Sequence, residues 1–226
     1  EPTSAGSYRT RSLGNVFEEI NYLVDTYKIN ELDLMDDMFA AKPSRVIEFS
    51  ERITPYKMLW NCQLRASSAR EKVLPKMKES GCWQISYGFE SGSPKVLKSM
   101  KKGTRVEHIA NAIELNKKNK VGIQGNFIYG DPAEDLDTLK ETIDFTRNYK
   151  DLMLGYGMVI PYPGTVLYQN LIDNKTIDSK KDFYFMPRHY NMTGLNNADY
   201  YYMLGKVNLE EKRRSKRFIS KILSVE

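Results

Sequence analysis

Carboxylate, amide and guanidinium side chains recur where short apolar segments of the sequence end. The pair Asp36-Asp37 and the residues Arg65, Glu90 and Asn126 all lie at or near such segment ends. Paired carboxylates are typical of general acid–base chemistry, and a few convergent polar groups are typical of a ligand site. These residue types therefore predict a site for a polar ligand, provided that the fold brings the segment ends together.

Polar and apolar residues alternate along these segments, as expected of strands, whose successive side chains point to opposite faces. The polar positions are Asp33 and Asp37, then Asn61, Gln63 and Arg65, then Gln84, Ser86, Gly88 and Glu90, then Gln124 and Asn126. The apolar positions between them, such as Trp60, Ile85 and Phe127, take the other face. An unpaired buried polar group costs roughly 1–3 kcal/mol, so the polar face is expected to line a cavity that holds something polar.

The positions of these segments predict the fold class. Strands are predicted at 32–35, 59–65, 83–90, 121–129 and 154–160, with helices between and after them. A repeat of about 30 residues is typical of βα units around a parallel sheet. A flat doubly wound sheet would bury both faces, whereas one polar face favours an α/β barrel or partial barrel. The carboxyl ends of the strands form the active end of such barrels.

The strand–helix rhythm stops after residue 174. Residues 175–206 are rich in Tyr, Asn and Asp and predict an irregular wrap, and 208–225 predicts a terminal basic helix. We interpret the basic run 212–217 as one solvated helix face. The predicted organisation is a barrel-type domain over 1–174, followed by a C-terminal wrap and helix over 175–226.

The composition excludes several classes of protein. Cys62 and Cys82 are the only cysteines, too few for a disulfide scaffold, a structural zinc site or an iron–sulfur cluster held by this chain alone. The net charge is only +5, which argues against nucleic acid as a partner. No apolar run approaches the roughly 20 residues of a membrane span, and no signal segment opens the chain. We therefore expect a cytoplasmic protein with no membrane partner and no metal ligands of its own.

Six short motifs occur in a fixed order along the predicted barrel domain. They are Tyr8–Ser12 (YRTRS), Asp36–Phe39 (DDMF), Trp60–Arg65 (WNCQLR), Gly88–Ser93 (GFESGS), Gly122–Gly130 (GIQGNFIYG) and Pro161–Thr165 (PYPGT). Together they resemble the catalytic barrel of the radical S-adenosylmethionine superfamily, most closely its cobalamin-binding branch of anaerobic cyclases and radical methyltransferases. The resemblance runs from about Tyr8 to Leu171.

The resemblance implies a partial (β/α)6 barrel and a specific chemistry. A [4Fe–4S] cluster on a Cys-x3-Cys-x2-Cys loop would cleave S-adenosylmethionine reductively to a 5′-deoxyadenosyl radical, for hydrogen abstraction or cobalamin-assisted methyl transfer. A small-molecule substrate and an electron donor such as flavodoxin or ferredoxin would be the partners. The three-cysteine loop and the first barrel strand are missing from this sequence, so the cluster ligands are expected upstream of Glu1. The chain alone is expected to be inactive.

The resemblance also implies cofactor-binding roles for individual residues. Asp36 and Asp37 would contact the methionine ammonium, and Gln63 and Arg65 its carboxylate or the substrate. Glu90, followed by Ser91, would lie beside the ribose and methionine. The adenine would meet the stretch with Gln124, Asn126 and Ile128 on one side and Pro161 and Tyr162 at its edge.

Two alternative functions stay open at this point. A conventional barrel enzyme would use Asp37 and Glu90 for acid–base chemistry, and a binding module would keep the barrel without the cluster. At the structural level, Asp36-Asp37 or Glu90 could instead cap a helix. Cys62 and Cys82 are predicted to be buried thiols.

Overall fold

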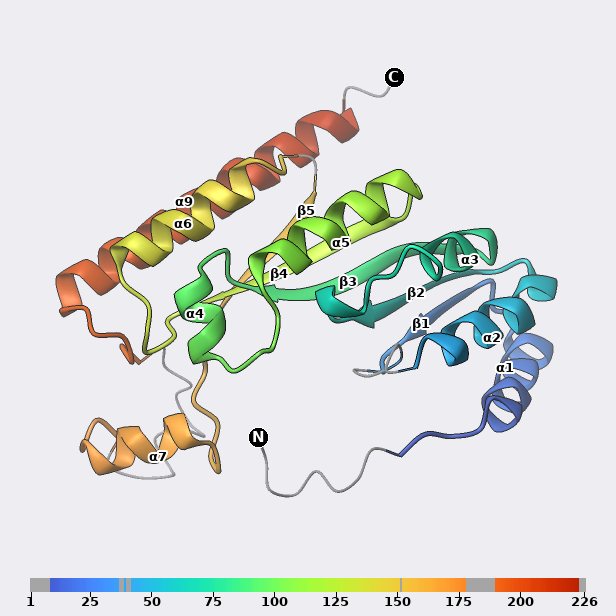
Figure 1. Ribbon diagram of the computed structural model, residues 1–226, viewed down its shortest axis with the longest axis horizontal. Helices are drawn as coiled ribbons and strands as arrows, with labels where there is room; N and C mark the ends of the chain where they lie inside the picture. Colours follow the sequence, from blue (N-terminus) through green and yellow to red (C-terminus); the bar gives the residue numbers. More distant parts are fainter. Residues whose placement is uncertain (1–8, 37–38, 40–41, 151, 178–189, 224–226) are drawn as a thin grey trace.

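The computed structural model describes residues 9–36, 39, 42–150, 152–177 and 190–223, without the side chains of 218–223. Within these residues, five parallel strands form one sheet in the order β1-β2-β3-β4-β5 (Figure 1). The strands are β1 (Glu31–Leu34), β2 (Leu59–Leu64), β3 (Cys82–Glu90), β4 (Gly122–Tyr129) and β5 (Met153–Met158). The α-helices are α1 (Leu13–Tyr27), α2 (Pro43–Ile53), α3 (Leu74–Glu79), α4 (Pro94–Ser99), α5 (Val106–Lys118), α6 (Leu136–Arg147), α7 (Val166–Asp173) and α9 (Asn197–Leu223). Every strand therefore pairs with its sequence neighbour, which confirms the predicted series of βα units.

Short local signals place the ends of several helices. The hydroxyl of Ser12 accepts a hydrogen bond from the backbone N–H of Asn15 at 3.2 Å and begins α1, as predicted. The carboxylate of Asp135 accepts from the N–H of Thr138 at 2.9 Å and begins α6. Gly81 follows α3 with φ +98°, and a Cβ there would lie 2.3 Å from a backbone oxygen. Glycine is therefore required where the chain turns into β3.

The hydrophobic core covers one face of the sheet. Trp60, Ile85 and Tyr87 are fully buried there, while the residues between them are partly exposed. The Trp60 ring packs edge-on against Phe49 of α2, with centroids 5.3 Å apart. The predicted alternation of a buried apolar face and an open polar face is therefore confirmed, and the open face is available for a ligand.

The last helix begins earlier than the sequence predicted. Helix α9 starts at Asn197 and so includes residues that were expected to belong to an irregular wrap. Tyr200, Met203, Val207 and Glu210 are buried, and α9 lies alongside α6 and contacts β5 (Figure 1). Their spacing of three or four residues forms one helix face, and packing of that face stabilises a helix despite the polar composition.

The basic run 212–217 is only partly solvated. Lys212, Lys216 and Arg217 are exposed, but Arg214 is half-buried. The Arg214 guanidinium donates hydrogen bonds to backbone carbonyls at the end of α6, so the interpretation of the run as one solvated face is wrong for this residue. In the described part of the chain, no helix is long and apolar enough to cross a membrane.

Candidate active site

The open face of the sheet carries polar side chains in rows that cross neighbouring strands. Residues paired in register on adjacent parallel strands lie side by side. The three rows are Asp33–Asn61–Gln84, Gln63–Ser86–Gln124 and Gly88–Asn126–Gly155. The sheet therefore brings together Gln63, Gln124 and Asn126, three of the residues that the sequence placed in the site.

Two amide groups in these rows, those of Gln63 and Gln84, are held only weakly by the protein itself. The Gln63 and Gln84 Nε2 atoms donate to methionine sulfurs, Met35 at 3.8 Å and Met153 at 3.9 Å. A thioether is a weak acceptor, so both amides retain the capacity to bind a stronger one. A polar ligand on this face would supply it.

Glycine opens space beside Asn126. The Asn126 amide donates to Ser86 Oγ at 3.1 Å. A Cβ at the neighbouring Gly155 would lie 2.9 Å from the Asn126 oxygen, so a larger residue would displace the amide. The absence of a side chain at this position leaves room along β4 and β5, where Ile128 lies half-buried in the same alternation as Asn126.

Glu90 lies at the carboxyl end of β3, and its side chain folds back over the open face. Its backbone has φ +65° and sits at a register irregularity between β3 and β4. The carboxylate is 8% exposed and pairs with Lys102 Nζ at 2.5 Å. A Cβ at Gly88 would lie 2.5 Å from Glu90 Oε1, which places the carboxylate directly above Gly88. A non-glycine residue in this conformation costs roughly 1–3 kcal/mol and marks candidate functional positions.

Ser91 points away from the open face. Its hydroxyl lies 2.9 Å from Thr142 Oγ1 of α6, and the same Thr142 oxygen accepts from the N–H of Gly92 at 3.1 Å. These contacts anchor the loop after β3 against α6. Ser91 thus stabilises the loop that carries Glu90 and does not itself line the open face. The N-cap of α4 is Ser93, so Glu90 is not a helix cap.

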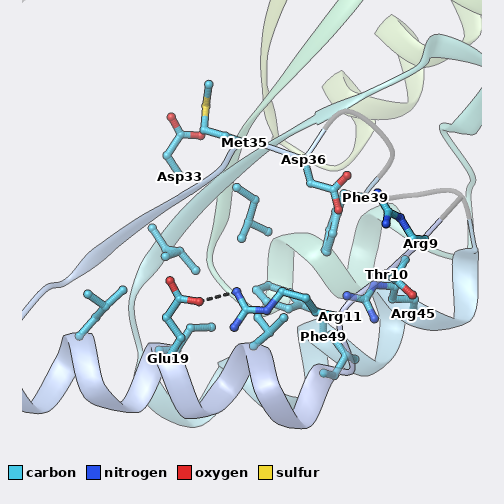
Figure 2. Close-up of a pocket in the computed structure, with 16 residues that line it drawn as sticks. Arg9, Thr10, Arg11, Glu19, Asp33, Met35, Asp36, Phe39, Arg45 and Phe49 are labelled. Atoms are coloured by element: carbon cyan, nitrogen blue, oxygen red, sulfur yellow. Dashed lines mark hydrogen bonds and ion pairs between the residues drawn. The ribbon is translucent and has the colours of Figure 1, made fainter. Parts of the chain in front are cut away.

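A cavity of about 710 Å³ lies between α1, β1 and α2 and includes Asp36 (Figure 2). Arg9 and Arg45 line it together with Asp36, and Arg11 lies over α1, where it pairs with Glu19 at 2.5 Å. Lys42 is the N-cap of α2, so Asp36 does not cap that helix. Asp37 lies outside the described residues. The cavity combines the carboxylates of Glu19, Asp33 and Asp36 with guanidinium groups, a combination that suits a zwitterionic ligand.

The remaining predicted site residues, Arg65, Pro161 and Tyr162, lie outside the polar rows on the open face of the sheet. Arg65 is exposed immediately after β2, so its guanidinium is accessible at the carboxyl end of the sheet. Pro161 is buried and Tyr162 is 60% exposed, both in the turn that leads to α7. The structure does not bring Pro161 and Tyr162 into the rows on the open face.

The cysteines do not provide a metal site. Cys62 and Cys82 are both fully buried, as predicted. The side-chain contact with Cys82, and then burial, hold the pKa of Cys62 well above its usual range, so the thiol stays protonated. Among the described residues, no group of three or more His, Cys, Asp or Glu side chains is placed to hold a metal ion. The two thiols therefore do not fit a [4Fe–4S] cluster.

Sequence reasoning missed two residues that shape the site. Lys102 pairs with Glu90, but nothing in its spacing indicates this, because the contact depends on the backbone irregularity at Glu90. Arg45 lines the cavity beside Asp36. The sequence did not indicate this, because an arginine in the first turn of a helix is typical of a solvent-exposed position.

A family model and individual known proteins both match this chain. The family described as "Radical SAM superfamily" matches residues 3–146. An uncharacterised methyltransferase of Pyrococcus horikoshii is 32% identical over 172 residues, 75% of this chain and 38% of the relative. The anaerobic magnesium-protoporphyrin IX monomethyl ester cyclase of Rubrivivax gelatinosus is 28% identical over 79% of this chain and 33% of its own length. The chain thus spans between a third and two fifths of the length of these relatives.

Solved structures share the fold at low sequence identity. The radical S-adenosylmethionine methyltransferase TsrM from Kitasatospora setae, with cobalamin and a [4Fe–4S] cluster bound, superposes with a TM-score of 0.65 and 16% identity, over 73% of this chain and 34% of that one. The apo form of the cobalamin-dependent S-adenosylmethionine radical enzyme OxsB gives a TM-score of 0.60 and 20% identity, over 93% of this chain and 33% of that one. The five strands and their helices therefore match part of the barrel of such enzymes.

Proposed function

The chain belongs to the radical SAM superfamily, and from this premise we propose that its open sheet face binds S-adenosylmethionine in a radical enzyme of the methyltransferase type. The observation that carries the proposal is the set of rows on the open face, which end at the Glu90 carboxylate. Amides, a carboxylate and room left by glycine lie on one face of β2, β3 and β4. This arrangement suits a ligand with a polar nucleoside and a charged amino-acid tail.

The residues of this chain would bind and orient the ligand. We assign the methionine ammonium to Asp36, with Asp37 next to it in sequence, and the methionine carboxylate to Gln63 and Arg65. Glu90 would accept hydrogen bonds from the ribose hydroxyls, since an ionised carboxylate is an acceptor only. The adenine would lie against Gln124, Asn126 and Ile128. Pro161 and Tyr162 would contact the edge of the adenine.

The cluster is not part of what this chain supplies. Cys62 and Cys82 do not fit it, because both thiols are buried in the core. The names of the relatives, methyltransferases and cyclases, favour a radical reaction, and the cobalamin in solved structures of this fold favours methyl transfer. We extend the proposal to a cobalamin-dependent methyltransferase with an electron donor of the flavodoxin or ferredoxin class.

The first test is binding of S-adenosylmethionine to the chain, followed by saturation-transfer-difference NMR, which detects weak ligands. We expect signals from the adenine and ribose protons with the unaltered chain. Asn126→Leu should reduce them at least about tenfold, because it removes the amide and fills the open face with a branched side chain. Circular dichroism would verify that the variant is folded.

The matched control is Asn111→Leu, the same change at an exposed position of α5. It should leave the signals unchanged. Absence of signals with the unaltered chain, or equal signals from both variants, would overturn the assignment of the open face as the binding site.

A further inference from the structure

A second cavity lies at the opposite end of the sheet from Glu90. It has a volume of about 570 Å³ and is formed where α6 ends and the second half of α9 passes it. We call it the α6–α9 cavity, and its lining residues are Arg147, Asn148, Lys150, Glu210, Arg213, Arg214, Lys216 and Arg217. Lys150 lies three residues before Met153, the first residue of β5, so the cavity is at the amino end of the parallel strands, whereas Glu90 is at a carboxyl end.

The charge of the α6–α9 cavity is unusual for this chain. Among its described lining residues, six side chains are cationic and one is a carboxylate. This surplus of five positive charges equals the net charge of +5 of the whole chain, so the rest of the sequence is electrically balanced. Concentrating like charge in one concave place raises the local potential and attracts counter-ions.

Three of the six cations have a structural use. Arg214 donates to the backbone oxygen of Tyr149 at 3.2 Å and to that of Thr146, and thereby closes the end of α6. Arg147 and Arg213 both contact the Glu210 carboxylate, Arg213 at 2.8 Å. Burial would raise the pKa of Glu210, but the two guanidinium groups outweigh it and hold this pKa below its usual value. The Glu210 carboxylate therefore stays ionised, and it is already paired with the guanidinium groups of Arg147 and Arg213.

The other three cationic side chains have no structural contact of this kind among the described residues. Lys150, Lys216 and Arg217 are exposed, and within the described part of the chain no hydrogen bond or ion pair involves them. The buried Nε of Arg214 also has no acceptor there. The three exposed cations thus add positive charge that the one carboxylate among the described lining residues, Glu210, does not balance.

We propose that the α6–α9 cavity binds a compact anion with two or more phosphate groups, such as pyrophosphate or the phosphates of a nucleotide. Guanidinium forks pair with phosphate oxygens in two parallel hydrogen bonds, and lysine adds point charge. The volume lies in the range of small-ligand sites. The described lining residues include no aromatic side chain, so they provide no base stacking, on which single-stranded nucleic acid binding depends.

This site is independent of the proposed function. S-adenosylmethionine carries no phosphate, and none of the described lining residues of the α6–α9 cavity lies on the open face. An anion bound there would touch both the end of α6 and the second half of α9. We therefore expect it to stabilise the docking of α9 on the barrel domain.

The test is calorimetric titration of the chain with sodium pyrophosphate and with ADP, against sodium sulfate at equal ionic strength. We expect binding of pyrophosphate, with sulfate at least about tenfold weaker because it offers fewer oxygen acceptors and less charge. Tighter binding of ADP than of pyrophosphate would assign the phosphates to a nucleotide, and equal binding would assign them to the free anion; both support the site.

The variant pair tests the location. Lys216→Ala/Arg217→Ala removes two exposed cations of the cavity and should weaken pyrophosphate at least about tenfold. Lys78→Ala/Lys98→Ala removes the same charge from exposed positions of α3 and α4 and should change affinity less than about twofold. Equal weakening by both pairs, no preference over sulfate, or binding of an RNA oligonucleotide without any binding of pyrophosphate would overturn the proposal.

Discussion

Glu90 keeps a nearly buried carboxylate at the end of β3 in a strained backbone conformation, and Lys102 is its counter-ion at 2.5 Å. Removing one partner of a largely buried pair leaves a charge without compensation. We expect Lys102→Met to lower the free energy of unfolding by about 2 kcal/mol, less than for a fully buried pair because the Lys102 side chain is 34% exposed. Urea denaturation followed by circular dichroism measures this difference.

The control for this charge pair is Lys98→Met, the same substitution on an exposed residue of α4. A cost similar to that of Lys102→Met would mean that the ion pair does not hold Glu90. A combined Lys102→Met/Glu90→Gln chain should recover part of the loss, since a neutral amide in place of the carboxylate removes the buried charge.

At the scale of elements, α9 docks through one buried face. Met203 is fully buried on that face, whereas Leu209 on the same helix is 43% exposed. We expect Met203→Ala to lower the free energy of unfolding by about 3 kcal/mol through the cavity it leaves. Leu209→Ala, the matched control, should cost less than about 1 kcal/mol. Equal costs in urea unfolding would contradict the docking of α9 from residue 197 onward.

The elements differ in how far the sequence predicts them. The strands were predictable because alternation is a local pattern, and the paired rows on the open face follow from it. The beginning of α9 was not predictable, because Tyr200 and Met203 lie among polar residues. Their common face is apparent only once α6 and β5 cover it. The pairing of Glu90 with Lys102 needed a register irregularity that no pattern encodes. The site was thus predictable where it depends on strand alternation and not where it depends on tertiary contact.

At the scale of the whole molecule, Glu134 connects the loop after β4 to the start of α6. Its Oε2 accepts from the N–H of Gly130 at 2.6 Å, and its Oε1 is buried without a hydrogen-bond partner among the described residues. Asp131 and Asp135 are nearby acids, and Tyr129 and Tyr200 face it from β4 and α9. Burial raises the pKa of Glu134 from 4.5 to about 7 despite the Gly130 hydrogen bond.

This raised pKa predicts how stability depends on pH. Between pH 4.5 and about 7 the folded carboxyl keeps its proton while the unfolded one loses it, so stability falls as pH rises through this window and stays lower above it. Glu134→Gln stays neutral and keeps an acceptor for Gly130. We expect it to match the unaltered chain at pH 4 and to exceed its free energy of unfolding by up to about 3 kcal/mol at pH 8.

Urea unfolding at several pH values would measure both curves. Glu141→Gln, at an exposed position of α6, controls for the loss of one negative charge from the segment that follows Glu134. A difference between Glu134→Gln and the unaltered chain that is constant from pH 4 to pH 8 would mean that this carboxyl does not titrate in the window. A difference that grows with pH places a proton on Glu134 in the folded molecule, because only a group with a raised pKa gives that sign.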